Sequence, residues 1–343
     1  MNTLENIPSD PTAAERKQDH IQLAFQSQVE SLHLDKRFSY EPLLSAHPQE
    51  QLPETIFLGK SIQTPIWVSS MTGGTEKAFK INSNLAKACN QFGMGMGLGS
   101  CRALLESDTR LKDFDFRAII GSHLPFYANI GIAQLEYLLK ENKSDKIDQM
   151  VDRLQADGII IHVNPLQEWL QPEGDKITVA PIQTIQQFIA LTKKKIIVKE
   201  VGQGMGRESL RALLQLPIEA IEFAAHGGTN FSKLELLRGE KQKQDGYAAI
   251  AQIGHSAAEM TGFVNDLLQE LGANALCKQF IVSGGVKNFL DGYYLREQLH
   301  ASSVYGQASA LLQYAEHSYE ALEGFLYHQL EGLKLAKAFF RVK

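Results

Sequence analysis

Short apolar runs alternate with helical patterns along most of this 343-residue chain, from residue 65 to residue 340. Each run is apolar on both faces and is bounded by glycine or polar residues, which is typical of parallel strands covered by helices. The eight expected strands are 65–70, 93–99, 125–131, 158–164, 195–201, 219–225, 279–284 and 302–307. Eight strand–helix units in about 250 residues predict a TIM (β/α)8 barrel rather than an open doubly wound sheet.

Amphipathic helices are expected between these strands, and one final helix is expected near the end of the chain. Examples of the helices between strands are 78–92, 146–156, 181–193, 209–215, 255–271 and 289–299, and the final helix is expected over 316–340. Residues 1–60 do not join the alternation, because a helical start is followed there by a polar segment punctuated by proline. We therefore expect an N-terminal helical arm over 1–60 and the barrel over 61–343.

Composition narrows the class of protein further. A formal net charge of −5 argues against a surface that binds nucleic acid or an anionic membrane. No apolar run is long enough to span a bilayer, and the polar amino terminus lacks the apolar stretch of a signal peptide. Three scattered cysteines (Cys89, Cys101 and Cys277) show no metal-type pairing, so a reducing cytoplasmic location is the simplest expectation.

Polar residues gather where the predicted strands end. In a TIM barrel the carboxyl ends of the strands carry the chemistry, so these residues are the candidates for a functional site. In chain order they are Ser69–Gly74, Ser100–Arg102, Asn129, His162–Glu168, Lys199–Glu200, His226–Asn230, Ser283–Gly285 and Tyr305–Gln307.

Lys199 lies within an apolar strand, and a buried ammonium group needs a partner. Glu200 is a poor one, because adjacent residues of a strand point to opposite faces. A structural ion pair with another carboxylate is the alternative. We favour a functional role for Lys199, as a cation beside an electron-rich ring or an anionic cofactor.

Two sets of glycines invite a ligand interpretation. Gly93, Gly95, Gly97 and Gly99 leave one strand face without side chains, which either admits a flat ligand or allows close packing inside a narrow barrel. The spacing does not fit a dinucleotide fingerprint. The glycines at the ends of the last two strands match the usual phosphate pocket of this fold, although glycines at such positions are often simple turns. These are Gly284, Gly285 and Gly306.

Two polar clusters point to a metal and an anion. Glu168 follows His162, Asn164 and Gln167, which together fit a one-carboxylate Mg²⁺ site completed by water and substrate phosphate. Zinc is not expected, because no set of Cys and His has suitable spacing. A small cationic group near the amino terminus is the second cluster, and a solvated helix face is its simpler interpretation. Its members are Arg16, Lys17 and His20.

Taken in order, several of these segments resemble the type 2 isopentenyl-diphosphate isomerases, a flavin-dependent family, from Arg16 to Ala308. The motifs that carry the resemblance are Arg16-Lys17-x-Asp19-His20, Ser70–Gly74, Met96–Ser100 with Arg102, His162-x-Asn164-Pro165-x-Gln167-Glu168, Val198–Gly202, Gly227–Thr229 and Ser283–Val286. The resemblance implies an FMN-containing TIM barrel that interconverts isopentenyl and dimethylallyl diphosphate with Mg²⁺ and reduced flavin. It also implies NADPH as the reductant of the flavin and assembly as a homo-oligomer, a tetramer or an octamer.

The resemblance also assigns roles to single positions. FMN would contact Met71, Thr72, Gly73, Ser100, Asn129, Lys199 and Thr229, with Gly284, Gly285, Gly306 and Gln307 at its phosphate. The substrate would contact Arg16, Lys17, His20, Ser100, Arg102, Asn164 and Gln167. Gln167 and His162 are the candidate catalytic residues, and Glu168 would hold Mg²⁺.

The chain departs from the family pattern at three places. Cys101 stands where the family usually has Gln, and we expect its side chain to point away from the site. Asn230-Phe231 replaces a usual Ser-Trp, and 247–256 lacks the usual Trp-Gly-x-Pro-Thr element, so the wall after the sixth strand and the affinity for flavin are expected to differ. Two alternatives stay open: a flavin-dependent oxidoreductase of the 2-hydroxy-acid oxidase type, and a non-catalytic protein that binds flavin or a prenyl diphosphate.

Overall fold

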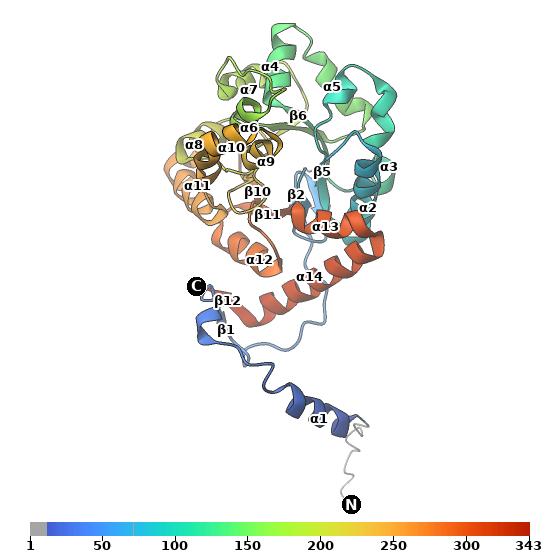
Figure 1. Ribbon diagram of the computed structural model, residues 1–343, viewed down its shortest axis with the longest axis vertical. Coiled ribbons are helices and arrows are strands. Elements are labelled where there is room, and N and C mark those ends of the chain that lie inside the picture. The colour runs from blue at the N-terminus through green and yellow to red at the C-terminus, as the bar shows by residue number, and fades with distance from the viewer. Residues whose placement is uncertain (1–11, 71) are drawn as a thin grey trace, which may run out of the picture. The chain divides into compact units, whose positions relative to one another are not determined.

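The computed structural model describes residues 12–70 and 72–343, which divide into two compact units (Figure 1). The smaller unit comprises residues 12–39 and Lys343, and the larger comprises Tyr40–Val342. The smaller unit contains α1 (Ala13–Leu23) and the 3-10 helix η1 (Ser31–His33), and β1 (Phe38–Tyr40) crosses the boundary. Residues 40–60, which the sequence analysis groups with the arm, belong to the larger unit.

The larger unit is built on a closed barrel of eight parallel strands, ringed by helices (Figure 1). The order around the barrel is β10-β11-β4-β5-β6-β7-β8-β9. The strands are β4 (Ile66–Val68), β5 (Gly95–Gly97), β6 (Phe126–Gly131), β7 (Gly158–His162), β8 (Lys195–Lys199), β9 (Ala220–Glu222), β10 (Gln279–Ser283) and β11 (Ser302–Gln307). Each of the eight predicted runs contains one of them, so the predicted TIM barrel is confirmed.

Helices follow the strands as expected, with several that the sequence analysis did not identify. The expected ones are α2 (Glu76–Phe92), α5 (Asp145–Arg153), α7 (Pro181–Ile189), α8 (Arg207–Leu214), α11 (Ala257–Leu271), α12 (Phe289–Gln298) and α14 (Tyr319–Phe339). The others are α3 (Arg117–Ile120), α4 (Ile132–Lys140), α6 (Pro165–Leu170), α9 (Phe231–Arg238), α10 (Lys241–Tyr247) and α13 (Ser309–His317). Short 3-10 helices are η2 (Arg102–Leu105), η3 (Asp108–Asp113), η4 (Ala248–Gln252) and η5 (Gly272–Asn274), and β12 (Phe340–Val342) ends the unit.

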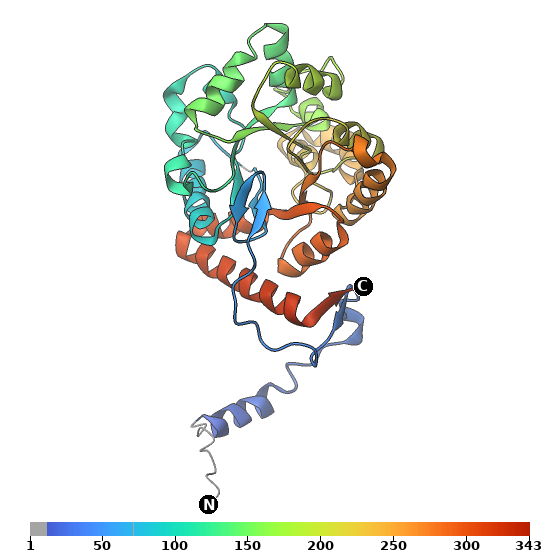
Figure 2. The ribbon, with the colours of Figure 1, turned by 180° about the vertical axis from the view of Figure 1, so that it is seen from behind.

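A β-hairpin closes the amino end of the barrel. It is formed by β2 (Thr55–Phe57) and β3 (Lys60–Ile62), and Figure 2 shows it lying over the strands. The amine of Lys60 donates to Asp157, just before β7, and to the carbonyls of Ser122 and Leu124, just before β6. The Leu58 amide donates to Gln279 at the start of β10, at 2.8 Å. Because this end is closed, the carboxyl end is left for ligands.

The glycine ladder proves to be a packing device. A Cβ on Gly95 would overlap the ring of Trp67, and one on Gly97 would lie 2.5 Å from Cδ1 of Ile160. Gly93 is not in the strand at all, since it ends α2 with a φ of +64°. Trp67 is 1% exposed and packs edge-on against Tyr127, with ring centroids 6.1 Å apart. At Gly95 and Gly97, close packing therefore takes the space that a flat ligand would need.

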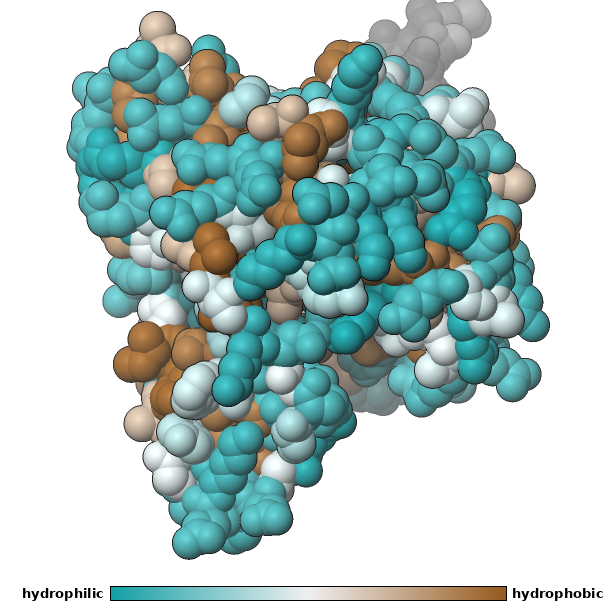
Figure 3. All heavy atoms as spheres, turned by 90° about the horizontal axis from the view of Figure 1, so that it is seen from above, coloured by the Kyte–Doolittle hydropathy of each residue, from teal (hydrophilic) through white to brown (hydrophobic). Residues whose placement is uncertain are grey.

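The face of the molecule seen in Figure 3 is mostly hydrophilic, with small and separate hydrophobic patches. Within the described ranges, no helix is both long enough and apolar enough to cross a membrane.

Candidate functional site

Late strands of the barrel form a small cavity at its carboxyl end, here called the late-strand pocket. It brings together several of the residues predicted to bind the cofactor, and its volume is about 70 Å³. Those residues are Lys199, Thr229, Gly284, Gly285 and Gly306, and the lining also includes Ser69, Ser70 and Glu222. A second cavity of about 340 Å³ shares Ser70, Thr229 and Phe231 with it and is lined by Thr72 as well.

Several polar atoms that line the late-strand pocket have no hydrogen-bond partner within the described residues. They are the hydroxyls of Ser69 and Ser70 and one carboxylate oxygen of Glu222, a residue that is 0% exposed. The other oxygen of Glu222 accepts from the Ser283 hydroxyl at 3.2 Å. Buried polar atoms are rarely left unpaired, so this pocket has the properties of a site that a polar ligand completes.

Lys199 extends into this pocket from the end of β8, and its side chain is buried. Its neighbours in the sheet register are His162 on one side and Glu222 on the other. Glu200 faces away and accepts hydrogen bonds from the backbone N–H groups of 202, 203 and 204, while burial raises the pKa of its carboxyl. The prediction that Glu200 does not partner Lys199 is confirmed.

His162 lies at the end of β7, and its imidazole is half-buried. Nδ1 lies 2.7 Å from Oδ1 of Asn129, a predicted cofactor ligand at the end of β6. Burial, reinforced by the charge of Lys199, lowers the pKa of His162 to about 3. The folded protein therefore holds a neutral imidazole here at neutral pH.

Asn164, Gln167 and Glu168 form a cluster at α6, directly after β7. The side-chain amide of Asn164, 2% exposed, donates to both Gln167 Oε1 and Glu168 Oε1 at 3.0 Å. The second oxygen of Glu168 accepts from the backbone N–H of Asp175 at 2.7 Å. The predicted grouping of these three residues is thus present, and each carboxylate oxygen of Glu168 accepts a hydrogen bond.

Glu235 extends this cluster, and the sequence analysis missed it. Gln167 donates from its amide to Glu235 Oε1 at 3.2 Å, and Arg238 pairs with the other oxygen at 2.6 Å. The carboxylate belongs to α9 and is buried. Residues 231–238 were not among the expected helices, and a single glutamate there carried no signal of a site in the sequence. Glu222 could have been found, because it interrupts an apolar strand just as Lys199 does.

The remaining predicted residues lie in several places. Ser100 and Arg102 are exposed after β5, and Gly73 packs against the ring of Phe114. Arg16, Lys17 and His20 are all exposed on α1, in the smaller unit, so the predicted helix is confirmed and their role at the substrate stays a prediction. Gln307 is buried but does not line the late-strand pocket. Met71 lies outside the described residues.

Comparison with known proteins decides the family. No family model matches the chain. An isopentenyl-diphosphate delta-isomerase of Rickettsia africae (strain ESF-5) is 32% identical over 331 residues, covering 94% of this chain and 92% of the relative. One from Rickettsia canadensis (strain McKiel) is 33% identical over 308 residues, 89% of this chain and 86% of that one. The chain belongs to the type 2 isopentenyl-diphosphate delta-isomerase family.

Solved structures with the same fold include flavin enzymes of other families. A flavocytochrome b2 variant with sulfite bound aligns with a TM-score of 0.60 and 12% identity, over 88% of this chain and 72% of that chain. A mandelate oxidase variant with an FMN adduct aligns with a TM-score of 0.53 and 10% identity, over 90% of this chain and 89% of that chain. At these identities the likeness shows the fold alone, whereas the isomerase relatives show the family, so this family member is an enzyme.

Cys101, one of the departures from the family pattern, lies in the core of this isomerase. The residue is fully buried, its backbone N–H donates to the Asn129 carbonyl at 2.8 Å, and burial raises the pKa of its thiol to about 12. The prediction that its side chain points away is therefore consistent with its position in the core.

Proposed function

We propose that this chain interconverts isopentenyl and dimethylallyl diphosphate by a 1,3-allylic proton shift, with reduced FMN, Mg²⁺ and NADPH as the reductant of the flavin. One observation carries the proposal. The Asn129–His162 hydrogen bond and the Lys199–His162 neighbour pair join the late-strand pocket to the Asn164–Gln167–Glu168 cluster, so a cofactor and a substrate could meet at the same end of the barrel.

The late-strand pocket fits the phosphate end of FMN. Its unpaired hydroxyls offer donors to the phosphate. Lys199 supplies a cation to another part of the cofactor, and it lies next to the buried carboxylate of Glu222 in the sheet register. Gly284 and Gly285 line the pocket and have φ values of +96° and +75°, a left-handed backbone that favours glycine. The adjoining 340 Å³ cavity supplies further room for the larger parts of the cofactor.

The cluster at α6 fits one-carboxylate binding of Mg²⁺. No group of three or more Asp, Glu, His or Cys is arranged as a metal site within the described part of the chain. Mg²⁺ is often held by one or two carboxylates together with water and substrate phosphate oxygens. Glu168 would be that carboxylate, held in orientation by Asn164 and by the backbone of Asp175.

The isomerisation adds a proton at one carbon and removes one two carbons away. When bound, reduced FMN supplies the acid–base group for this exchange. Gln167 would present its amide to the reacting alkene, and its bond to buried Glu235 would hold that amide in place. His162 is neutral and carries its proton on the nitrogen that faces Asn129, so it acts as a hydrogen-bonding group rather than as a cationic acid.

Purified protein tests the proposal when it is supplied with FMN, NADPH, Mg²⁺ and isopentenyl diphosphate. Formation of dimethylallyl diphosphate is expected, and no conversion under these conditions would refute the activity. Glu168→Gln should lose the Mg²⁺-dependent activity but keep the yellow flavin colour. Glu50→Gln, which changes an exposed carboxylate before β2, is the matched control and should leave both unchanged. Assembly as a homo-oligomer and a cytoplasmic location stay predictions.

A further inference from the structure

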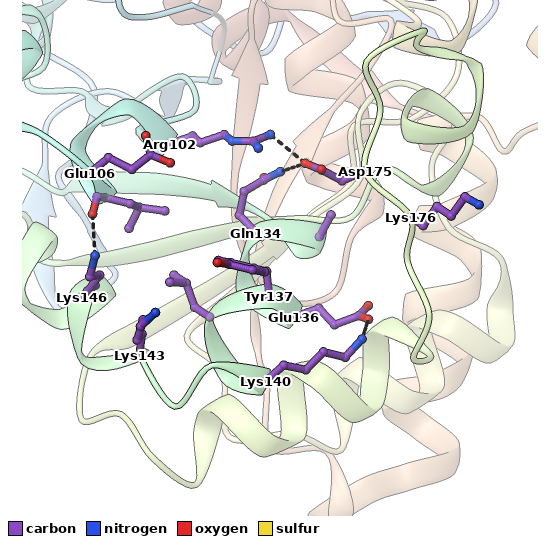
Figure 4. Close-up of a pocket in the computed structure, with 13 residues that line it drawn as sticks. Arg102, Glu106, Gln134, Glu136, Tyr137, Lys140, Lys143, Lys146, Asp175 and Lys176 are labelled. Atoms are coloured by element: carbon purple, nitrogen blue, oxygen red, sulfur yellow. Dashed lines mark hydrogen bonds and ion pairs between the residues drawn. The ribbon is translucent and has the colours of Figure 1, made fainter.

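One residue outside every predicted set contacts two of the predicted ligands. The carboxylate of Asp175 pairs with NH1 of Arg102 at 2.7 Å (Figure 4). The backbone N–H of Asp175 donates to Glu168 Oε2 at 2.7 Å. The same carboxylate oxygen accepts from the Gln134 amide at 2.8 Å. Asp175 thereby ties together the segments that follow β5, β6 and β7.

Arg102 keeps part of its binding capacity in this arrangement. Its ion pair with Asp175 uses one guanidinium nitrogen, NH1, while a guanidinium offers five N–H donors in a planar fork. The carboxylate of Asp175 accepts from both Arg102 and Gln134, so its charge is partly compensated. The pair orients the guanidinium and leaves donors for an incoming anion.

The surroundings favour an anion as well. Arg102 and Asp175 line a cavity of about 470 Å³ (Figure 4). Its lining carries five cations, Arg102, Lys140, Lys143, Lys146 and Lys176, and three carboxylates, Glu106, Glu136 and Asp175. Lys143 also pairs with Glu141 outside the lining, which leaves an excess of one positive charge. In a chain with a net charge of −5, this local excess of positive charge would raise the local concentration of a diphosphate.

Gly174 allows the backbone of Asp175 to approach Glu168. A Cβ at position 174 would overlap the carbonyl oxygen of Glu168, which is backbone and cannot move aside cheaply. Any side chain there would push the segment away from α6 and lengthen the bond from the Asp175 N–H to the Glu168 carboxylate.

We infer that Asp175 is a positioning residue that holds the diphosphate ligand Arg102 and the metal ligand Glu168 in register with each other. Its carboxylate orients the guanidinium, and its backbone N–H orients the carboxylate of Glu168. This inference rests on the proposed function, because it assigns a diphosphate to Arg102 and Mg²⁺ to Glu168.

The two contacts can be separated by substitution. Asp175→Asn keeps the backbone N–H but removes the charge that orients Arg102. We expect the Kd of inorganic diphosphate, measured calorimetrically on the FMN-loaded protein, to rise about fivefold, as suits a partly exposed ion pair. The KM for isopentenyl diphosphate should rise equally, while kcat changes less than twofold and the half-saturating Mg²⁺ concentration stays the same. Gly174→Ala tests the other contact. Because it lengthens the bond from the Asp175 N–H to the Glu168 carboxylate, it should raise the Mg²⁺ concentration at which activity is half-maximal.

Two controls separate positioning from a general charge effect. Asp245→Asn removes the same charge from an exposed pair with Lys241 and should change none of these quantities. In an Arg102→Ala background, Asp175→Asn should have no further effect on the Kd, because the group that it orients is gone.

Each outcome bears on the inference. An unchanged or a tighter Kd in Asp175→Asn, with the wild type binding diphosphate and isomerising its substrate, overturns the positioning role alone. A wild type that neither binds diphosphate nor isomerises the substrate overturns the proposed function and this inference together. The inference is also contradicted if Asp175→Asn raises the Kd of diphosphate by the same factor in the Arg102→Ala background as in the wild type.

Discussion

Oδ1 of Asn129 lies 2.7 Å from Nδ1 of His162, and this contact fixes the tautomer of the imidazole. Nδ2 of Asn129 donates to the carbonyl of Leu98 at 2.8 Å, so the amide oxygen is the atom that faces the ring. An oxygen acceptor requires a proton on Nδ1, which leaves Nε2 of the neutral ring as an acceptor. His162 therefore meets any ligand as a hydrogen-bond acceptor.

The lowered pKa of His162 predicts a pH dependence of stability. Its folded-state pKa of about 3 lies below the ordinary value of 6.5. The neutral imidazole therefore contributes fully to the free energy of unfolding above pH 6.5, and this contribution is lost as the pH falls toward 3. Urea unfolding between pH 7 and pH 4 should show that the wild type loses about 1 kcal/mol per pH unit more than His162→Gln. His300→Gln, at an exposed histidine, should retain the wild-type slope, and equal slopes in all three proteins would contradict the prediction.

Lys199 should determine the affinity for FMN. Lys199→Met removes the buried cation of the late-strand pocket, and loss of a charge-assisted contact to an anion costs about 1.5–3 kcal/mol, roughly a tenfold to hundredfold weaker Kd. Lys195→Met lies on the same strand but at its exposed amino end and should bind FMN normally. Quenching of flavin fluorescence measures both, and equal affinities would show that Lys199 does not contact the cofactor.

The barrel and the α6 cluster could be predicted from the sequence because each depends on local order in the chain. Two-faced apolar runs specify parallel strands, and His162, Asn164, Gln167 and Glu168 are close together because they follow one strand. Glu235 could not be predicted, because it reaches Gln167 from α9, 68 residues later. The role of the glycine ladder was also ambiguous. Only the fold shows that Trp67 and Ile160 take the space beside Gly95 and Gly97.

The Gly95–Trp67 contact predicts the outcome of adding a single methyl group. Gly95→Ala would place Cβ against a rigid indole in a closed interior and should destabilise the fold by about 1–3 kcal/mol. Gly262→Ala is the matched control, because its Cβ would meet nothing within 4 Å and it lies within α11. Removing a helical glycine should stabilise the protein by about 0.5–1 kcal/mol. Denaturant unfolding measures the free energy of unfolding of both variants. If both substitutions changed it in the same direction, the packing interpretation would be contradicted.

Replacing Gln307 by an apolar residue should stabilise the fold, because both polar atoms of its amide are buried without a partner in the described structure. Gln307→Met keeps the length of the side chain and removes the unpaired groups, so the free energy of unfolding of the FMN-free protein should rise by about 1–2 kcal/mol. Gln279→Met is the control with the opposite sign, since Gln279 accepts from the Leu58 N–H at 2.8 Å and donates to the Glu219 carbonyl at 3.3 Å. The resemblance places Gln307 at the FMN phosphate, but its side chain does not line the late-strand pocket, so an FMN affinity of Gln307→Met equal to that of the wild type would show that the amide makes no contact with the cofactor. Weaker binding with unchanged stability would instead show that this amide contacts the cofactor directly.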